Sequence, residues 1–206
     1  MPKIVLNTII LILIFIISAS WYFGAFLPLR KAQLLIVALQ RAGEVKSLDE
    51  FKGVFSAALD FYSPVGQSET IKHTASSVFS TLNQFDLPPE TAADLISFVR
   101  KYLDPMLSEK KGDGLIQQFY IMGDIYRASA FKYKNADYLR AAANVYEAGL
   151  VLAPKRPQFL YSVLQVYLSM QDAQKATDVT RKILNYWPDD PEMKKFLQGE
   201  TTTIQL

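Results

Sequence analysis

The feature that most constrains this chain is an uncharged apolar segment near its N-terminal end. No residue from Ile4 to Leu29 carries a charge, and the centre of this segment is an unbroken apolar run from Ile9 to Ile17. A helix needs about 20 such residues to cross the ~30 Å hydrocarbon layer of a bilayer. The aromatic residues Trp21, Tyr22 and Phe23 then fall where an interfacial belt forms. The sequence therefore predicts that residues 1–29 form a single transmembrane anchor.

A cleavable signal peptide is the alternative interpretation of the same segment. Lys3 would be its basic start, and Ser18-Ala19-Ser20 would be its small-residue cleavage site. However, apolar residues continue past Ser20 through Phe26 and Leu27, so a chain cut at Ser20 would begin with an exposed apolar end. The anchor is the preferred hypothesis, with the signal peptide kept as the alternative.

The sidedness of the anchor depends on two opposing arguments. Lys3 precedes the apolar segment, whereas Arg30 and Lys31 come after it, and the positive-inside rule then places the C-terminal domain in the cytoplasm. A very short N-terminal tail before a long apolar helix is, in contrast, the usual layout of an anchor that exports the domain attached to its C-terminal end. We expect the soluble domain on the extracytoplasmic side.

Charge and cysteine content exclude several classes of function. Apart from Lys3 and Arg30, basic and acidic residues are equal in number, so the net charge of +2 gives no electrostatic footprint for nucleic acid. The chain has no cysteine, which excludes disulfides, thiolate metal sites and cysteine nucleophiles.

Beyond Arg30 the chain is predicted to be all-α, because apolar residues recur at helical spacing and no stretch alternates with a period of two. The stripe Ile71, Ala75, Val78, Phe79, Leu82 is one example of this spacing, and Ala92, Leu95, Ile96, Val99, Leu103 is another. Turn and capping residues separate the helices. These breaks fall at Ala42-Gly43, at Ser47 to Glu50 as a capping box, at Ser63 to Gly66, at Pro88-Pro89, at Lys110 to Gly114 and at Pro154 to Pro157.

The C-terminal part carries a repeat. Pro154 and Pro188 are 34 residues apart, and Tyr167 and Ala176 between them take the aromatic place of a first helix and the small place of a second helix. A preceding copy runs from Phe119, Met122, Gly123 and Tyr126 through Ala142, Tyr146 and Gly149 to Pro154. Its first helix is longer than the consensus, with the insertion expected around Phe131 to Lys134.

This spacing resembles the tetratricopeptide repeat, and the resemblance implies an α-solenoid of helix pairs. The corresponding domains are residues 30–112, with repeat-like helical pairs, and residues 113–206, with two repeats and a capping helix. Further residues make the chain similar to the C-terminal tail of bacterial O-antigen polymerase or ligase-like membrane proteins. They are Pro28 to Ala32, Ala38 to Gln40, Phe51 to Tyr62 and Pro64 to Glu69. The resemblance implies a cell-envelope role and no catalytic residue.

No constellation for catalysis, cofactors or metals is found in the sequence. His73 is the single histidine, and zinc sites of the usual kind need further His or Cys ligands. We expect His73 on the helix surface. The acids Asp49-Glu50, Glu90 and Asp189-Asp190 fall at helix starts, where they cap free N–H groups. The chain is thus not expected to be an enzyme or to hold a cofactor or metal.

The remaining candidate site is the groove that such a solenoid lines with its first helices. Gln and Tyr recur at matching places in the two copies, and amide and phenol groups suit an extended peptide. The predicted partner-binding residues are Gln117, Tyr120, Asp124, Arg127, Gln158, Tyr161 and Gln165. An equally weighted alternative is that these residues form a solvated surface.

The sequence leads to two expected functions. The first is a membrane-anchored scaffold or adaptor that binds a protein or peptide partner in the cell envelope. The second is an accessory or detached tail of an O-antigen or glycan polymerase or ligase system, whose activity lies in a separate subunit. The partner and the oligomeric state are left open.

Overall fold

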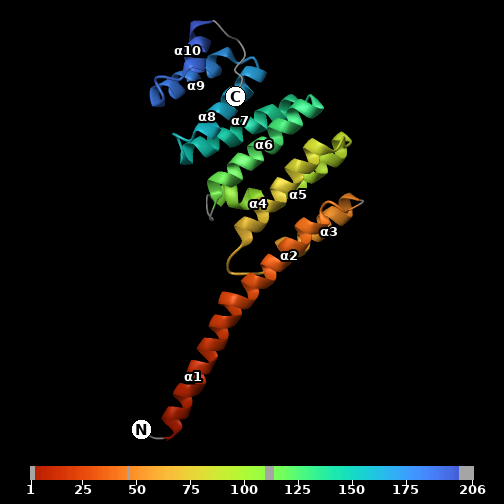
Figure 1. Cartoon of the computed structure of the whole chain (residues 1–206), viewed down its shortest axis with the longest axis vertical. Helices are drawn as coiled ribbons and strands as arrows, with labels where there is room; N and C mark the ends of the chain where they lie inside the picture. The colour runs from red at the N-terminus through yellow and green to blue at the C-terminus, as the bar shows by residue number, and fades with distance from the viewer. Residues whose placement is uncertain (1–2, 46, 110–113, 200–206) are drawn as a thin grey trace. The chain divides into compact units, whose positions relative to one another are not determined.

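The computed structural model describes residues 3–45, 47–109 and 114–199, and all secondary structure in these ranges is helical. This confirms the all-α class. The first three elements form one continuous helix (Figure 1). They are α1 (Lys3–Trp21), the π-helical turn η1 (Tyr22–Phe26) and α2 (Leu27–Arg41). The other helices are α3 (Leu48–Leu59), α4 (Gln67–Gln84), α5 (Pro89–Glu109), α6 (Leu115–Tyr133), α7 (Ala136–Leu152), α8 (Pro157–Ser169), α9 (Ala173–Tyr186) and α10 (Pro191–Gln198).

Helix boundaries follow the local chemistry of the sequence. The Ser47 hydroxyl accepts the Glu50 N–H at 3.1 Å and so caps α3. Pro157 opens α8, where the missing N–H of proline costs nothing. The Asp190 carboxylate accepts the N–H groups of Glu192 and Met193 and so starts α10. The break at residues 110–114 lies outside the described residues apart from Gly114.

The chain divides into two compact units, residues 1–77 and 78–206, and the division falls inside α4. The boundary at residue 112, which rests on the repeat pattern alone, stays a prediction.

In the first unit, α2 packs against α3 through one face. Leu27, Lys31 and Ala38 of α2 are buried on this face. The Lys31 ammonium donates to the carbonyl oxygens of Ala58 at 3.1 Å and Phe61 at 2.7 Å. These carbonyls lie at the C-terminal end of α3, where free acceptors and the negative end of the helix dipole favour a cation. Lys31 therefore fixes the end of α3 to α2.

One helix, Lys3–Arg41, is long and apolar enough to cross a membrane, and none of its most apolar window is buried inside the protein. Its 39 residues correspond to ~58 Å at 1.5 Å per residue. The hydrocarbon layer takes up only ~30 Å of that length. A helix that spans the membrane in this way thus also extends well beyond it.

In the second unit, consecutive helices from α5 to α10 pack each against the next, and α6 also contacts α8. Only residues 134 and 135 separate α6 from α7, so two helices that pack together over such a short link run antiparallel. The buried side chains include Phe119, Met122, Tyr146 and Leu160, which the repeat pattern assigns to the interior.

Helix α6, the first helix of the pair α6 and α7, is longer than α8, the first helix of the pair α8 and α9, as expected from the insertion around Phe131 to Lys134. Helix α6 has 19 residues and α8 has 13. The additional residues at the C-terminal end of α6 include Lys132, whose ammonium donates to the carbonyls of Leu82, at 2.8 Å, and Phe85. The insertion thus caps the end of α4.

Gly123 marks the closest approach between α6 and α7. A Cβ at this position would lie 2.3 Å from Cε1 of Tyr146, closer than real Cβ atoms come to any neighbour. The small residue expected at Gly123 is therefore required by the ring of Tyr146. In the same way, a Cβ at Gly149 would lie 2.5 Å from Cε1 of Phe159 on α8.

Candidate functional site

The seven candidate residues lie on two helices that contact each other. Gln117, Tyr120, Asp124 and Arg127 belong to α6, and the other three belong to α8. Residues at matching places are 41 positions apart, as with Gln117 and Gln158 or Tyr120 and Tyr161. The contact between α6 and α8 therefore brings two copies of a Gln-x-x-Tyr pattern onto neighbouring helices.

Arg127 links these two helices. Its guanidinium donates to the amide oxygen of Gln165 at 2.9 Å and to the carboxylate of Asp124 at 3.1 Å. Asp124 and Gln165 occupy matching places in the two copies, so Arg127 joins equivalent positions of α6 and α8. Three of the seven candidates are thus bonded to one another, while the buried Nε of Arg127 has no hydrogen-bond partner in the described part of the chain.

The carboxylate of Asp124 has a further partner that the sequence pattern did not identify. Tyr146 of α7 is fully buried and donates its hydroxyl to Asp124 at 2.6 Å. Asp124 itself is only 8% exposed, so it lies beneath the surface instead of lining it. The repeat pattern assigns Tyr146 to the core, and that placement is confirmed, but no pattern reveals that its hydroxyl reaches Asp124.

This environment shifts the pKa of the groups in the cluster. Burial, followed by the Asp124 charge and the hydrogen bond to it, raises the pKa of Tyr146 well above its ordinary value. Burial alone would lower the pKa of Arg127, but Tyr146 and Asp124 beside it outweigh this effect and raise it. Both shifts keep the hydrogen-bonding protons of the cluster in place at neutral pH.

The two tyrosines of the pattern have different surroundings. Tyr120 is half-buried, and its ring lies 5.8 Å from that of Phe159 and 6.1 Å from that of Tyr146. Tyr161 stacks on Trp187 at 6.5 Å and donates its hydroxyl to Asp190. Burial and the bond to Asp190 raise the pKa of Tyr161 to about 12. Tyr161 therefore holds the start of α10 against α8.

Gln117 and Gln158 are the two exposed amides among the candidates. Both are exposed, and neither has a hydrogen-bond partner among the residues that the structure describes. The seven predicted residues thus separate into an internal cluster, two partly buried rings and two exposed amides. The amides and the open faces of the rings are thus the groups that are available to a ligand without breaking a hydrogen bond of the cluster.

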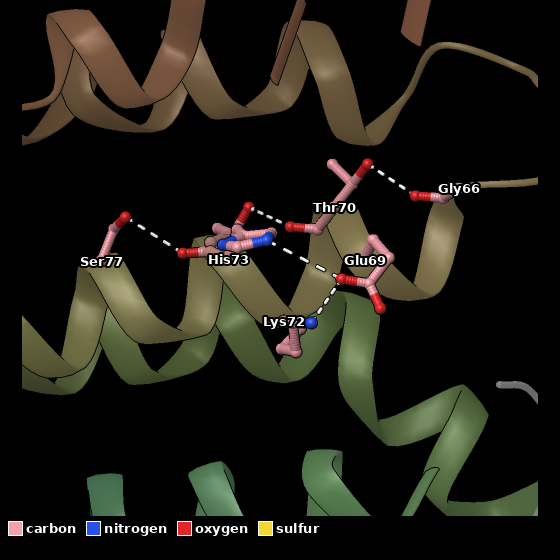
Figure 2. Close-up of polar contacts among 7 residues, drawn as sticks. Gly66, Glu69, Thr70, Lys72, His73 and Ser77 are labelled. Carbon is pink, nitrogen blue, oxygen red and sulfur yellow. Dashed lines mark hydrogen bonds and ion pairs between the residues drawn. The ribbon is translucent and has the colours of Figure 1, made fainter. Parts of the chain in front are cut away.

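His73 lies elsewhere, on the first unit's part of α4, and carries no comparable site. Figure 2 shows its ring beside Glu69, with Nε2 3.7 Å from the carboxylate, while Lys72 pairs with the same group. The Thr70 hydroxyl donates to the carbonyl of Gly66, just before α4, and the Ser77 hydroxyl donates to the carbonyl of His73 within it (Figure 2). The His73 side chain is 45% exposed, as expected for a surface residue. In the described part of the chain, no group of three His, Asp or Glu side chains could hold a metal.

A hollow that the sequence did not predict encloses about 270 Å³ between α7, α8 and α9. Leu150, Val151 and Val163 are among its apolar lining residues, and Glu147 and Lys182 also line it. The Glu147 carboxylate already accepts a hydrogen bond from the hydroxyl of Tyr167.

No family model, curated protein or solved structure matches this chain.

Proposed function

We propose that the protein is a membrane-anchored scaffold or adaptor of the cell envelope, and that α6 to α9 form two tetratricopeptide repeats that bind an extended peptide of a protein partner. The observation that carries the proposal is the Arg127–Gln165 bond between α6 and α8. It joins the first helices of the two pairs, and together with the Arg127–Asp124 bond it holds the equivalent residues Asp124 and Gln165 on one guanidinium.

The repeat assignment is supported by the packing of the pairs. Gly123 and Gly149 allow α7 to approach α6 and α8 to approach α7, and Pro154 and Pro188 come just after the ends of α7 and α9. In repeat proteins each pair buries its apolar face against the next one, so a polar bridge at the contact fixes their alignment.

The chemistry of the exposed groups indicates the kind of ligand. An extended peptide presents backbone N–H and C=O groups, and the exposed amides of Gln117 and Gln158 can both donate to and accept from such groups. The half-buried rings of Tyr120 and Tyr161 offer flat apolar contact beside them. Asp124, Arg127 and Gln165 act as the support of this surface, because they are hydrogen-bonded to one another.

The proposal is tested with the double variant Gln117→Ala/Gln158→Ala. The full-length chain, purified in detergent, is screened against an immobilised library of unstructured peptides, and the affinity of the peptides retained is measured by fluorescence anisotropy. We expect the double variant to bind them at least ~10-fold more weakly, since losing two hydrogen bonds of about 1 kcal/mol each reduces affinity by that order.

The matched control is Asn144→Ala/Asn185→Ala. These two residues are also exposed amides 41 positions apart, but they lie on the second helices α7 and α9. The control should bind peptides like the unaltered protein. Equal affinity of the Gln117/Gln158 variant and the control variant, or a library from which no peptide is retained, would overturn the assignment of the groove.

A further inference from the structure

The side of α2 that faces away from α3 carries an apolar stripe that nothing in the described structure covers. Leu29 is 60% exposed, Ile36 is 53% exposed and Leu39 is 37% exposed, and Ala32 between them is exposed as well. These residues succeed one another at intervals of three, four and three. Leu27, Lys31 and Ala38, which are buried in the packing with α3, lie on the opposite side of the helix.

A spacing of three and four residues is that of a coiled-coil seam, with Leu29 and Ile36 at the a positions and Ala32 and Leu39 at the d positions. The positions that flank such a seam decide which partner it accepts. Here they are occupied by Pro28, Gln33, Leu35, Gln40 and Ala42, and none is charged. The two arginines of α2 fall outside the seam and its flanks. Two copies of this face can therefore meet in parallel without opposing like charges.

The lipid bilayer does not account for this stripe. Helix α2 continues α1 without a break, so α2 leaves the membrane in the same direction as the span and cannot lie along its surface (Figure 1). Lys31 is bonded to the end of α3, which places this part of α2 within the folded domain. The stripe beyond Leu29 is therefore exposed to water in a single copy.

We propose that α2 forms a parallel homodimer, in which the stripe Leu29, Ala32, Ile36 and Leu39 of one copy packs against the same stripe of a second copy. Because both copies are anchored in one membrane with the same orientation, only the parallel arrangement is open to them. The seam covers only residues 29–39, but confinement to a membrane raises the effective concentration and compensates for its short length. Such a contact is isologous, as in most homodimers.

The absence of cysteine from the chain allows a direct test. Single-cysteine variants of the full-length chain are oxidised in the membranes where they are expressed, and disulfide-linked dimer is measured on non-reducing gels. A disulfide requires Cα atoms closer than about 7 Å, which a parallel seam provides only at the a and d positions. We expect Ile36→Cys and Ala32→Cys to form several-fold more dimer than Val37→Cys and Arg30→Cys.

Val37 is the matched control, since it is an apolar neighbour of Ile36 with 47% exposure and lies outside the seam. Equal yields at Ile36 and Val37, as random collision gives, would overturn the proposal, as would no dimer at any position. A second measurement uses Ile36→Glu, which should lower the dimer fraction counted by single-molecule photobleaching in vesicles of bacterial lipid, whereas Val37→Glu should leave it unchanged. Neither measurement depends on the groove of the second unit.

Discussion

At the scale of single residues, the interior of the second unit depends on the pair formed by Gly123 and Tyr146. The glycine leaves room for the ring, and the ring brings its hydroxyl to Asp124, which in turn holds Arg127. A close approach between two helices thus positions the bridge to a third helix. Substitutions at Gly123 and Tyr146 test this arrangement.

Gly123→Ala should destabilise the protein by about 1–3 kcal/mol, because the added methyl group has to displace the buried Tyr146 ring. The measurement is urea unfolding of the full chain in detergent, monitored by far-UV circular dichroism. Gly53→Ala is the control: it lies inside α3 with no atom within 4 Å of the added Cβ, and it should gain about 0.5–1 kcal/mol. A Gly123→Ala variant as stable as Gly53→Ala would contradict the packing described for Tyr146.

Alkaline pH should weaken the same cluster. The pKa of Tyr146 is raised in the folded protein, whereas in the unfolded chain it is about 10. Below pH 10 both states hold the phenol proton, so its stabilising effect is complete. Above that pH only the unfolded state releases the proton, and the free energy of unfolding falls by up to about 1.4 kcal/mol per pH unit for this group.

The measurement for this prediction is urea unfolding at pH 8 and pH 11. Between the two pH values, the free energy of unfolding should fall less in the Tyr146→Phe variant than in the unaltered protein. Part of the fall should remain, because the pKa values of Tyr161 and Tyr167 are also raised. An identical loss in the variant would show that Tyr146 does not contribute to the pH dependence.

At the scale of helices, two lysines fasten helix ends from a neighbouring element. Lys31 of α2 donates to the end of α3, and Lys132 of α6 donates to the end of α4. Each lysine donates to one carbonyl in the last turn of a helix, where donors from the same helix are missing, and to one carbonyl just beyond it. The helices of each unit are thus joined by polar contacts at their ends as well as by apolar packing.

Replacing Lys31 with Met should loosen the end of α3. Met keeps the apolar stem but leaves the carbonyls of Ala58 and Phe61 without their donor, which costs about 1–3 kcal/mol for buried groups. Hydrogen–deuterium exchange of the peptide covering residues 55–62 should become faster. Arg30→Met, at the exposed neighbouring position, should leave this exchange unchanged, and equal exchange in both variants would contradict the role given to Lys31.

The sequence predicts local features of the helices well and long-range polar contacts poorly. Ser47 and Pro157 reveal the starts of their helices, because capping depends on residues within one turn. The burial of Lys31 is not predictable in this way, since its partners lie 27 and 30 residues further along the chain. Polar contacts in the groove are equally hard to predict. The repeat pattern placed Asp124 and Gln165 at equivalent positions, but it could not show that Arg127 bonds to both residues and that Tyr146 bonds to Asp124.

At the scale of the whole molecule, the long apolar helix predicts that the protein resides in a membrane. We expect the chain to remain in the membrane fraction after extraction with alkaline carbonate, and its intact mass to include the residues before Ser20. The control variant Ile10→Lys/Ile14→Lys places two charges in the apolar segment, each costing about 2.5–3.5 kcal/mol at the centre of a bilayer, and should be extracted. A mass that begins after Ser20 would instead support the signal peptide.

The π-helical turn at Tyr22–Phe26 has a consequence for how the two ends of the long helix are aligned. A π turn takes in one residue more than an α turn, and one residue corresponds to a rotation of about 100° around the helix axis. A residue of α2 therefore faces a direction that differs by roughly a quarter turn from the direction it would face if Lys3–Arg41 were one regular α-helix. Removing one residue from this turn should leave an ordinary α turn and keep the faces of α1 and α2 aligned as they are, whereas removing one residue from α1 or α2 outside it should rotate one face against the other by about 100°.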